Sequence, residues 1–302
     1  MRPAWSVLLL TTLIGAGQGL FLALFASDLL FDPQLRFILW GAAISLALLA
    51  AGLLASFFHL GHPERAWRSA AMWRTSWLSR EVIALPLFMG LVFLYGLFAY
   101  LGRESLVIGI LATAACVALF ICTGMIYACL KFLQEWHTPL TVVNYTMLGT
   151  ASGLTAAAAL SAWLQPALSR PFALAALVAG ALAYLLRLAS LSRNTRLRPK
   201  STLASAIGVK HPRIVQIAQG AMGGSFNTRE FFHGRPREVV RAVRWGLLAL
   251  VFPVPALFLI FSSSPAMLLA AFLAQFAGML AERWYFFAEA RHPQNLYYQA
   301  IA

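Results

Sequence analysis

The sequence predicts an all-α integral membrane protein built as a bundle of eight transmembrane helices, with a long basic connection between the sixth and the seventh. Three observations predict this class. First, 61% of the 302 residues are hydrophobic and only 11% are charged, with a mean hydropathy of +0.75, a composition far from that of soluble domains. Second, eight apolar runs approach or exceed the roughly 20 residues that a spanning helix needs. Third, only one hydrophilic segment is long, at 193–236. The expected spans are 5–30, 37–58, 82–101, 105–130, 139–163, 171–191, 242–262 and 266–288.

The first apolar run is expected to remain in the protein as a span. It is longer than the ~7 to 15 residues of a signal-peptide core, and no small-x-small cleavage site follows it. Gly15, Gly17 and Gly19 fall within this run. Small residues let neighbouring helices approach closely, so a packing role is favoured over a binding role. We treat residues 1–302 as a single membrane-anchor domain, within which 193–239 is a cytoplasmic docking segment.

The basic residues predict the orientation. With eight spans, 20 of the 23 Lys and Arg residues share one face, and only Arg36, Arg103 and Arg170 lie on the other. Cytoplasmic loops carry an excess of such residues. The sequence therefore predicts that both termini and the connection after the second span are cytoplasmic.

The connection at 59–81 is the strongest candidate for a functional site. It places His59 and Glu81 at the same membrane face with Arg65 between them. Ionisable groups at this depth are read as functional by default. Pro63 favours the start of a short helix, on which Trp77 and the two preceding tryptophans would lie at headgroup depth. Two simpler interpretations stay open: an interfacial histidine, and a carboxylate stabilised by the dipole of the helix that it opens.

The histidine and the carboxylate together suit a lipid-soluble quinone. An imidazole can hydrogen-bond a ring carbonyl, and a carboxyl group can exchange protons with the aqueous side. Haem is disfavoured because all six histidines lie outside the spans or at their ends. Cys116, Cys122 and Cys129 show no metal-ligand spacing, so no iron-sulfur cluster or other metal site is expected on this chain. Electrons would come from another subunit.

The long basic connection alternates aromatic and charged residues, which favours a docking surface. Its candidate docking residues are Arg229, Phe231, Phe232, His233 and Arg235. Flexible linkers carry few large side chains. A basic loop that only sets orientation and touches anionic lipid is an equal alternative. No nucleic-acid partner is expected.

Three motifs resemble the membrane anchor subunit of the dimethyl sulfoxide reductase family (DmsC-like). They are His-Leu-Gly-x-Pro-x-Arg-Ala at 59–66, Leu-Ser-Arg-Glu at 78–81 and Ala-Gly-x-Leu-x-x-Arg at 277–283. The resemblance implies a quinone (ubiquinone or menaquinone) bound beside a ferredoxin-like iron-sulfur subunit, which serves a molybdopterin catalytic subunit. The family's quinone-site histidine and glutamate fall on His59 and Glu81, and we expect Arg65, Trp77 and Arg283 to complete the site.

One departure narrows the resemblance. Respiratory dimethyl sulfoxide reductase faces the periplasm, whereas the charges here place the site face in the cytoplasm. The segments 226–234 and 282–295 look like the SoeC-type anchor of cytoplasmic quinone-linked sulfite dehydrogenase. That resemblance implies sulfite oxidation to sulfate with quinone reduction, no catalytic residue on this chain, and catalytic subunits on the cytoplasmic side of a bacterial inner membrane. The alternatives are the anchor of a sulfur-compound reductase that oxidises quinol, and a small-solute transporter, which should show inverted repeats.

Overall fold

A computed structural model describes residues 5–198, 200, 202–215 and 236–291. Within these residues the chain is helical, and eight spans are long and apolar enough to cross a membrane, as predicted. The spans are α1 (Trp5–Leu30), α2 (Leu35–Phe57), α3 (Trp77–Tyr100), α4 (Leu106–Ala128), α5 (Pro139–Leu164), α6 (Ser169–Thr195), the pair α8 (Arg237–Val251) and α9 (Pro253–Phe261), and α10 (Pro265–Glu289). Short helices η1 (Pro63–Ala70), η2 (Pro166–Leu168) and α7 (Leu203–Ile207) lie in the connections.

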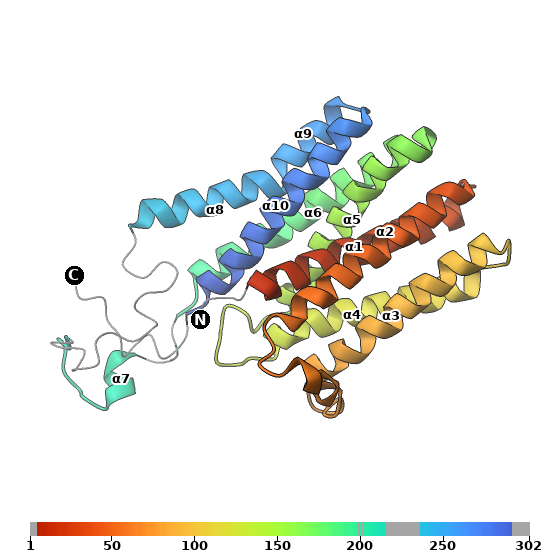
Figure 1. Ribbon diagram of the computed structural model, residues 1–302. Coiled ribbons are helices and arrows are strands. Elements are labelled where there is room, and N and C mark those ends of the chain that lie inside the picture. Colours follow the sequence, from red (N-terminus) through yellow and green to blue (C-terminus); the bar gives the residue numbers. More distant parts are fainter. Residues whose placement is uncertain (1–4, 199, 201, 216–235, 292–302) are drawn as a thin grey trace.

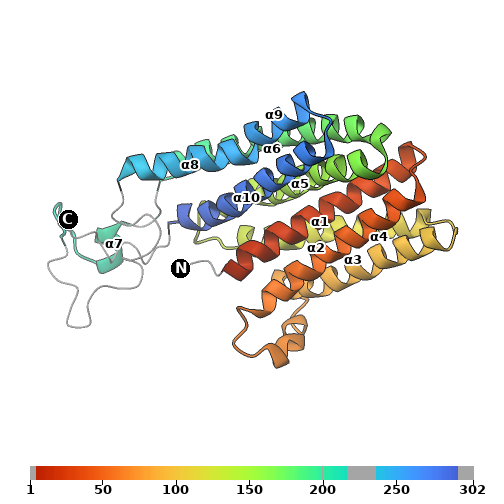
Figure 2. The same cartoon turned by 45° about the horizontal axis from the view of Figure 1, so that its top comes forward.

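Successive spans run antiparallel, so the bundle has two distinct ends (Figure 1). One end, which we call the charged end, carries the starts of α1, α3, α5 and α8 and the ends of α2, α4, α6 and α10. The connection with η1 and the short α7 also lie there (Figure 2). Short turns join the helices at the opposite end. All candidate site residues in the described part of the chain therefore gather at the charged end.

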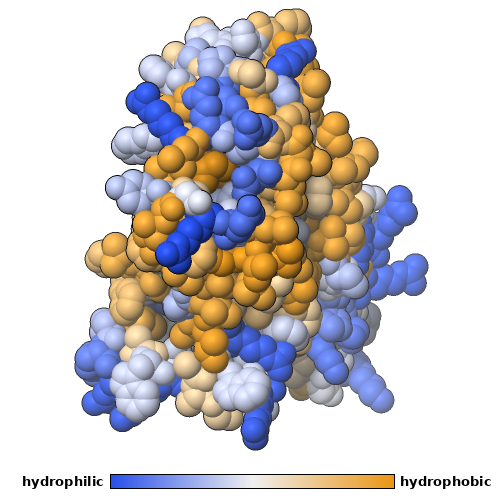
Figure 3. Space-filling view, turned by 90° about the vertical axis from the view of Figure 1, so that its right-hand side faces the viewer, coloured by the Kyte–Doolittle hydropathy of each residue, from blue (hydrophilic) through white to orange (hydrophobic). Residues whose placement is uncertain are grey.

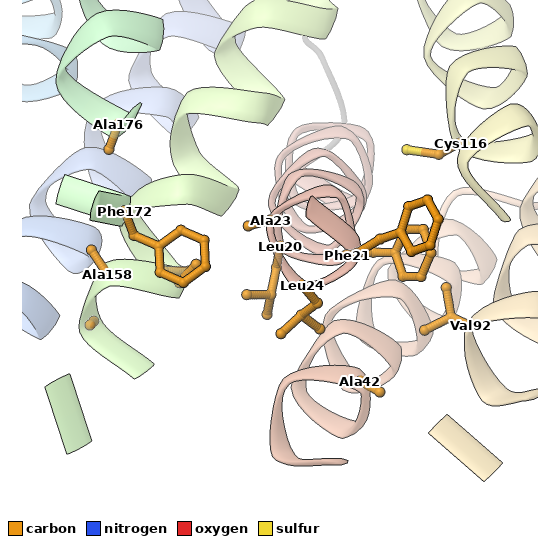
Figure 4. Packing of buried hydrophobic residues seen from close by; sticks show 14 of the residues in the cluster. Leu20, Phe21, Ala23, Leu24, Ala42, Val92, Cys116, Ala158, Phe172 and Ala176 are labelled. Atoms are coloured by element: carbon orange, nitrogen blue, oxygen red, sulfur yellow. The ribbon is translucent and has the colours of Figure 1, made fainter. Parts of the chain in front are cut away.

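Helix α1 forms the centre of the bundle and contacts α2, α4, α5 and α10. Its side chains Leu20, Phe21 and Leu24 lie between residues of α5 and α6 on one side and of α3 and α4 on the other (Figure 4). Phe21 packs edge-on against Phe88 and Tyr95 of α3, with ring centroids 5.4 and 5.5 Å apart. Such edge-to-face pairs add to the stabilisation from apolar burial.

Glycines bring α1 and α5 into backbone contact, which confirms the predicted packing role. A Cβ added to Gly19 would lie 2.3 Å from the carbonyl oxygen of Gly149, and one added to Gly153 would lie 2.0 Å from the carbonyl carbon of Gly19. Only glycine permits this approach. The crossing brings the first turns of α5 close to α1 at the charged end.

Large apolar side chains on the outer helices are exposed, as expected where lipid surrounds the bundle. Examples are Trp40, Leu54, Phe93, Val107 and Leu257. Seen from the end opposite the charged end, hydrophobic residues cover much of the molecule and hydrophilic residues form separate patches (Figure 3).

Two sequence predictions need correction. Helix α3 begins at Trp77, because Ser76 accepts a hydrogen bond from the Ser79 amide as N-cap, so Glu81 lies one turn inside the helix. Cys129 follows the last residue of α4 and is exposed. The seventh span is broken just before Pro253, since α8 and α9 meet at Phe252.

Candidate functional site

Glu81 is a buried carboxylate held between two helices. It lies on α3 with 7% of its surface exposed. The Thr123 hydroxyl on α4 donates a hydrogen bond to its Oε1 at 2.5 Å. A buried carboxylate needs such donors, since leaving it without partners would cost several kcal/mol. The bond fixes the carboxyl group on the face that α3 turns toward the bundle interior.

A small polar cavity adjoins Glu81. Its lining comes from four helices and comprises Thr11, Ile14, Gly15 and Gln18 of α1, Glu81 of α3, Phe120 and Thr123 of α4, and Tyr145 of α5. Its volume is about 10 Å³, which accommodates about one water molecule. An aromatic ring does not fit, so a larger ligand of Glu81 has to approach from outside this cavity.

His59 lies two residues beyond the end of α2 and is exposed at the charged end. Its Nδ1 is 3.2 Å from the Ser6 hydroxyl on α1. Partial burial disfavours the imidazolium and lowers the pKa of His59 below its ordinary value of 6.5. Ser6 and Thr11, which lines the Glu81 cavity, are five residues apart on α1 and therefore about 7.5 Å apart along its axis.

The connection with η1 is exposed and only partly matches the prediction. Pro63 begins a helix as expected, but that helix is a 3-10 helix. Arg65 lies on it, 3.7 Å from the exposed carboxylate of Glu64, and lines neither of the two cavities described in this subsection. Trp77 is not on η1; it is the first residue of α3, half-buried, with the Arg80 guanidinium 4.2 Å from its ring centroid.

Arg283 belongs to a second polar cluster, deeper in the bundle than η1 and built from α5, α6 and α10. Its Nη1 lies 3.2 Å from a carboxylate oxygen of Glu282. The other carboxylate oxygen of Glu282 lies 3.0 Å from Arg187 Nε, and Arg187 Nη2 lies 3.8 Å from Glu289. Glu282, Arg283 and Arg187 are at most 3% exposed. Buried charges persist only when paired in this way.

Tyr145 lies next to both the cavity at Glu81 and the polar cluster around Arg283. The Arg283 guanidinium carbon lies 3.5 Å from the centroid of its ring, and the Tyr127 ring stacks on it at 5.5 Å. A second cavity of about 10 Å³ lies on the Arg283 side, and Tyr145 lines both cavities. The second is lined by Glu135, Trp136, Thr141, Asn144, Tyr145, Arg187, Ser190, Asn194, Glu282, Arg283, Phe286 and Glu289.

Several of these residues escaped the sequence analysis. Threonine and tyrosine are common in apolar helices, so the sequence around Thr123 and Tyr145 did not mark either residue as part of a site. Arg187 did give a signal, because a basic residue inside an apolar run is a functional candidate, but it was counted only among the basic residues that predict the orientation. The candidate docking residues Arg229, Phe231, Phe232, His233 and Arg235 lie outside the described residues.

Comparison with known proteins shows similarity across the whole chain. Residues 1–298 match the family model described as DMSO reductase anchor subunit (DmsC). The chain is 53% identical over 325 aligned residues to a sulfite dehydrogenase subunit of Allochromatium vinosum, and the alignment spans the whole of both proteins. It is 32% identical over 120 residues to a subunit of the anaerobic dimethyl sulfoxide reductase of Haemophilus influenzae, covering 39% of this chain and 43% of that relative.

Proposed function

The chain belongs to the family of dimethyl sulfoxide reductase anchor subunits, and we propose that it anchors a molybdenum enzyme that oxidises sulfite and passes the electrons to membrane quinone. The observation that carries the proposal is the end-to-end similarity, at 53% identity, to a relative named as part of a sulfite dehydrogenase. The match to the dimethyl sulfoxide reductase relative spans only 39% of this chain. It supports membership of the anchor family but does not favour dimethyl sulfoxide as the substrate.

In this proposal the quinone is a substrate that binds beside His59 at the charged end. Its ring lies outside the Glu81 cavity, which is too small for it, against the exposed connection that carries Arg65 and leads to Trp77. Quinone reduction takes up two electrons and two protons. His59 hydrogen-bonds a ring carbonyl, and the lowering of its pKa by partial burial favours the neutral imidazole. Glu81 supplies protons from the bundle interior. Arg283 acts on Glu81 only indirectly, because it contacts the ring of Tyr145, which lines the Glu81 cavity.

The electrons come from a ferredoxin-like iron-sulfur subunit, which receives them from a molybdopterin subunit. Both dock on the charged end, and the segment 193–239 is the docking surface, with Arg229, Phe231, Phe232, His233 and Arg235 as contact residues. The support is the basic and aromatic character of that segment together with the anchor family. The membrane is the bacterial inner membrane, with both termini and the partner subunits on the cytoplasmic side, as the distribution of basic residues favours.

Purification in mild detergent from cells that also express the partner subunits tests the proposal. A tagged chain should retain an iron-sulfur protein and a molybdenum protein, and the complex should couple sulfite oxidation to quinone reduction. Replacing Arg229 and Arg235 by Ala should weaken retention of the partners, with Arg103→Ala at the opposite end as the control. Purification of the tagged protein alone would favour a transporter.

A reporter fused after Ala302 tests the orientation separately. The proposal predicts that the reporter lies in the cytoplasm. A periplasmic reporter, with quinol oxidation coupled to reduction of a sulfoxide, would identify a reductase anchor instead.

A further inference from the structure

Glu81 is buried, so a proton that leaves it for quinone has to be replaced through the protein. The cavity beside Glu81 accommodates about one water molecule. Within the described residues, the cavity's other polar lining groups are Thr11, Gln18, Thr123 and Tyr145. Of these, Thr123 donates to Glu81 itself, and the side chains of Thr11 and Gln18 donate to backbone carbonyls. Tyr145 is the group that this cavity shares with the second one.

The second cavity extends from Tyr145 toward the charged end. Glu135 and Glu289 line it, and both are only partly buried. Asn144 Oδ1 and Arg283 Nε belong to its lining residues, and both are buried without a hydrogen-bond partner in the described part of the chain. Buried polar atoms are rarely left unpaired, and a cavity of about 10 Å³ with several polar neighbours is suited to an ordered water.

We infer that Tyr145 relays protons from the charged end to Glu81, through a water site in each of the two cavities that it lines. A tyrosine hydroxyl can accept a proton from one neighbour while donating its own to another, so the residue stays neutral throughout. Arg283 cannot take part in the transfer because its guanidinium keeps its proton; its position against the ring holds Tyr145 between the two cavities. Each quinone that is reduced draws two protons along this route, and the partner iron-sulfur subunit supplies the two electrons.

This inference rests on the proposed function, in which Glu81 serves a quinone. Charged and titratable groups face the relay from every neighbouring element. They are Glu81 on α3, Tyr127 on α4, Glu135 in the connection before α5, Arg187 on α6, and Glu282, Arg283 and Glu289 on α10. Of these, Glu135 and Glu289 lie nearest to solvent and are the entry points for protons.

Tyr145→Phe in the complete complex tests the relay, because phenylalanine retains the ring contacts and lacks the hydroxyl. Sulfite-dependent reduction of a soluble quinone analogue should fall about 100-fold, the lower end of the contribution of a positioned proton-transfer group. The KM for the analogue and sulfite-dependent reduction of a dye should stay unchanged. The remaining quinone activity should decline more steeply as pH rises and show a larger solvent deuterium isotope effect.

Tyr285→Phe is the matched control, since Tyr285 is a buried tyrosine of the same end that lines neither cavity. If Tyr145→Phe does not assemble, the double variant Glu135→Gln with Glu289→Gln, which removes both entry points, decides instead with the same isotope measurement. Wild-type quinone rates and pH profiles in Tyr145→Phe, or in the variant that replaces it, would overturn the relay. Glu81→Gln separates the two claims: loss in Glu81→Gln with full activity in Tyr145→Phe overturns only the relay, whereas full activity in both overturns the quinone role of Glu81.

Discussion

The guanidinium carbon of Arg283 lies 3.5 Å from the centroid of the Tyr145 ring, and this contact joins two polar groups that the sequence places far apart. On one side, Arg283 pairs with Glu282, which also pairs with Arg187 of α6. On the other side, Tyr145 lines the cavity at Glu81. A cation over an aromatic face is attracted by about 2 kcal/mol or more when both groups are desolvated. The contact therefore ties α5 and α10 together where the proposed chemistry takes place.

Glu282→Gln should destabilise the protein strongly. The carboxylate lies between two buried guanidinium groups, and its removal leaves both without their shared counter-charge. Breaking a buried ion pair by removing one partner costs about 3–5 kcal/mol. Thermal unfolding of the purified complex, monitored by the loss of sulfite-dependent quinone reduction, should show a clearly lowered midpoint.

Glu64→Gln is the control for Glu282→Gln. Glu64 pairs with His62 and Arg65 on the exposed η1 segment, where an ion pair contributes at most about 1 kcal/mol. Equal effects of the two substitutions would show that the buried cluster does not stabilise the bundle.

Gly153→Ala should disrupt the crossing of α1 and α5. The added methyl would lie 2.0 Å from backbone atoms of α1, which cannot move without separating the helices. Overpacking of this kind costs about 1–3 kcal/mol or more. Lower expression and a lower unfolding midpoint are expected. Gly180→Ala on α6 is the comparison, because nothing lies within 4 Å of its added methyl. Unchanged stability of the first variant would contradict the close crossing.

The structure predicts that His59 titrates below its ordinary pKa of 6.5. The unfolded chain then binds the proton more tightly than the folded protein does. Stability from this group is complete above pH 6.5 and falls as the pH drops from there toward the folded pKa. NMR of isotope-labelled histidine in lipid nanodiscs, assigned with His59→Gln, measures this directly. A midpoint above 6.5 would show that a nearby negative charge outweighs the partial burial.

The sequence was sufficient for most of the fold because apolar length alone predicts membrane spans. The break at Pro253 and the packing role of Gly19 were also predictable, since each follows from a local property of the residue. The start of α3 was missed by several residues. Ser76 caps the helix ahead of Trp77, and polar residues in its first turn concealed the helix from a hydropathy reading.

The site was less predictable because its contacts join distant parts of the chain. The Thr123 hydroxyl reaches Glu81 across 42 residues. Tyr145 acquires its place between two cavities only once α1, α5 and α10 have packed together. Spacing placed His59 and Glu81 at one end of the bundle, but it did not identify the residues that hydrogen-bond to them, Ser6 and Thr123. Spacing also says nothing about the size of the cavity at Glu81, which has room for about one water molecule.

Glu81→Gln, assayed in the complete complex with two electron acceptors, tests the central claim most directly. Glutamine keeps the size of the side chain and the acceptor for Thr123, and it removes the exchangeable proton. Sulfite-dependent reduction of a quinone should fall about 100-fold or more, while sulfite-dependent reduction of a soluble dye stays at the wild-type rate. Equal activity with both acceptors, or equal loss of both, would contradict a quinone site at this end of the bundle.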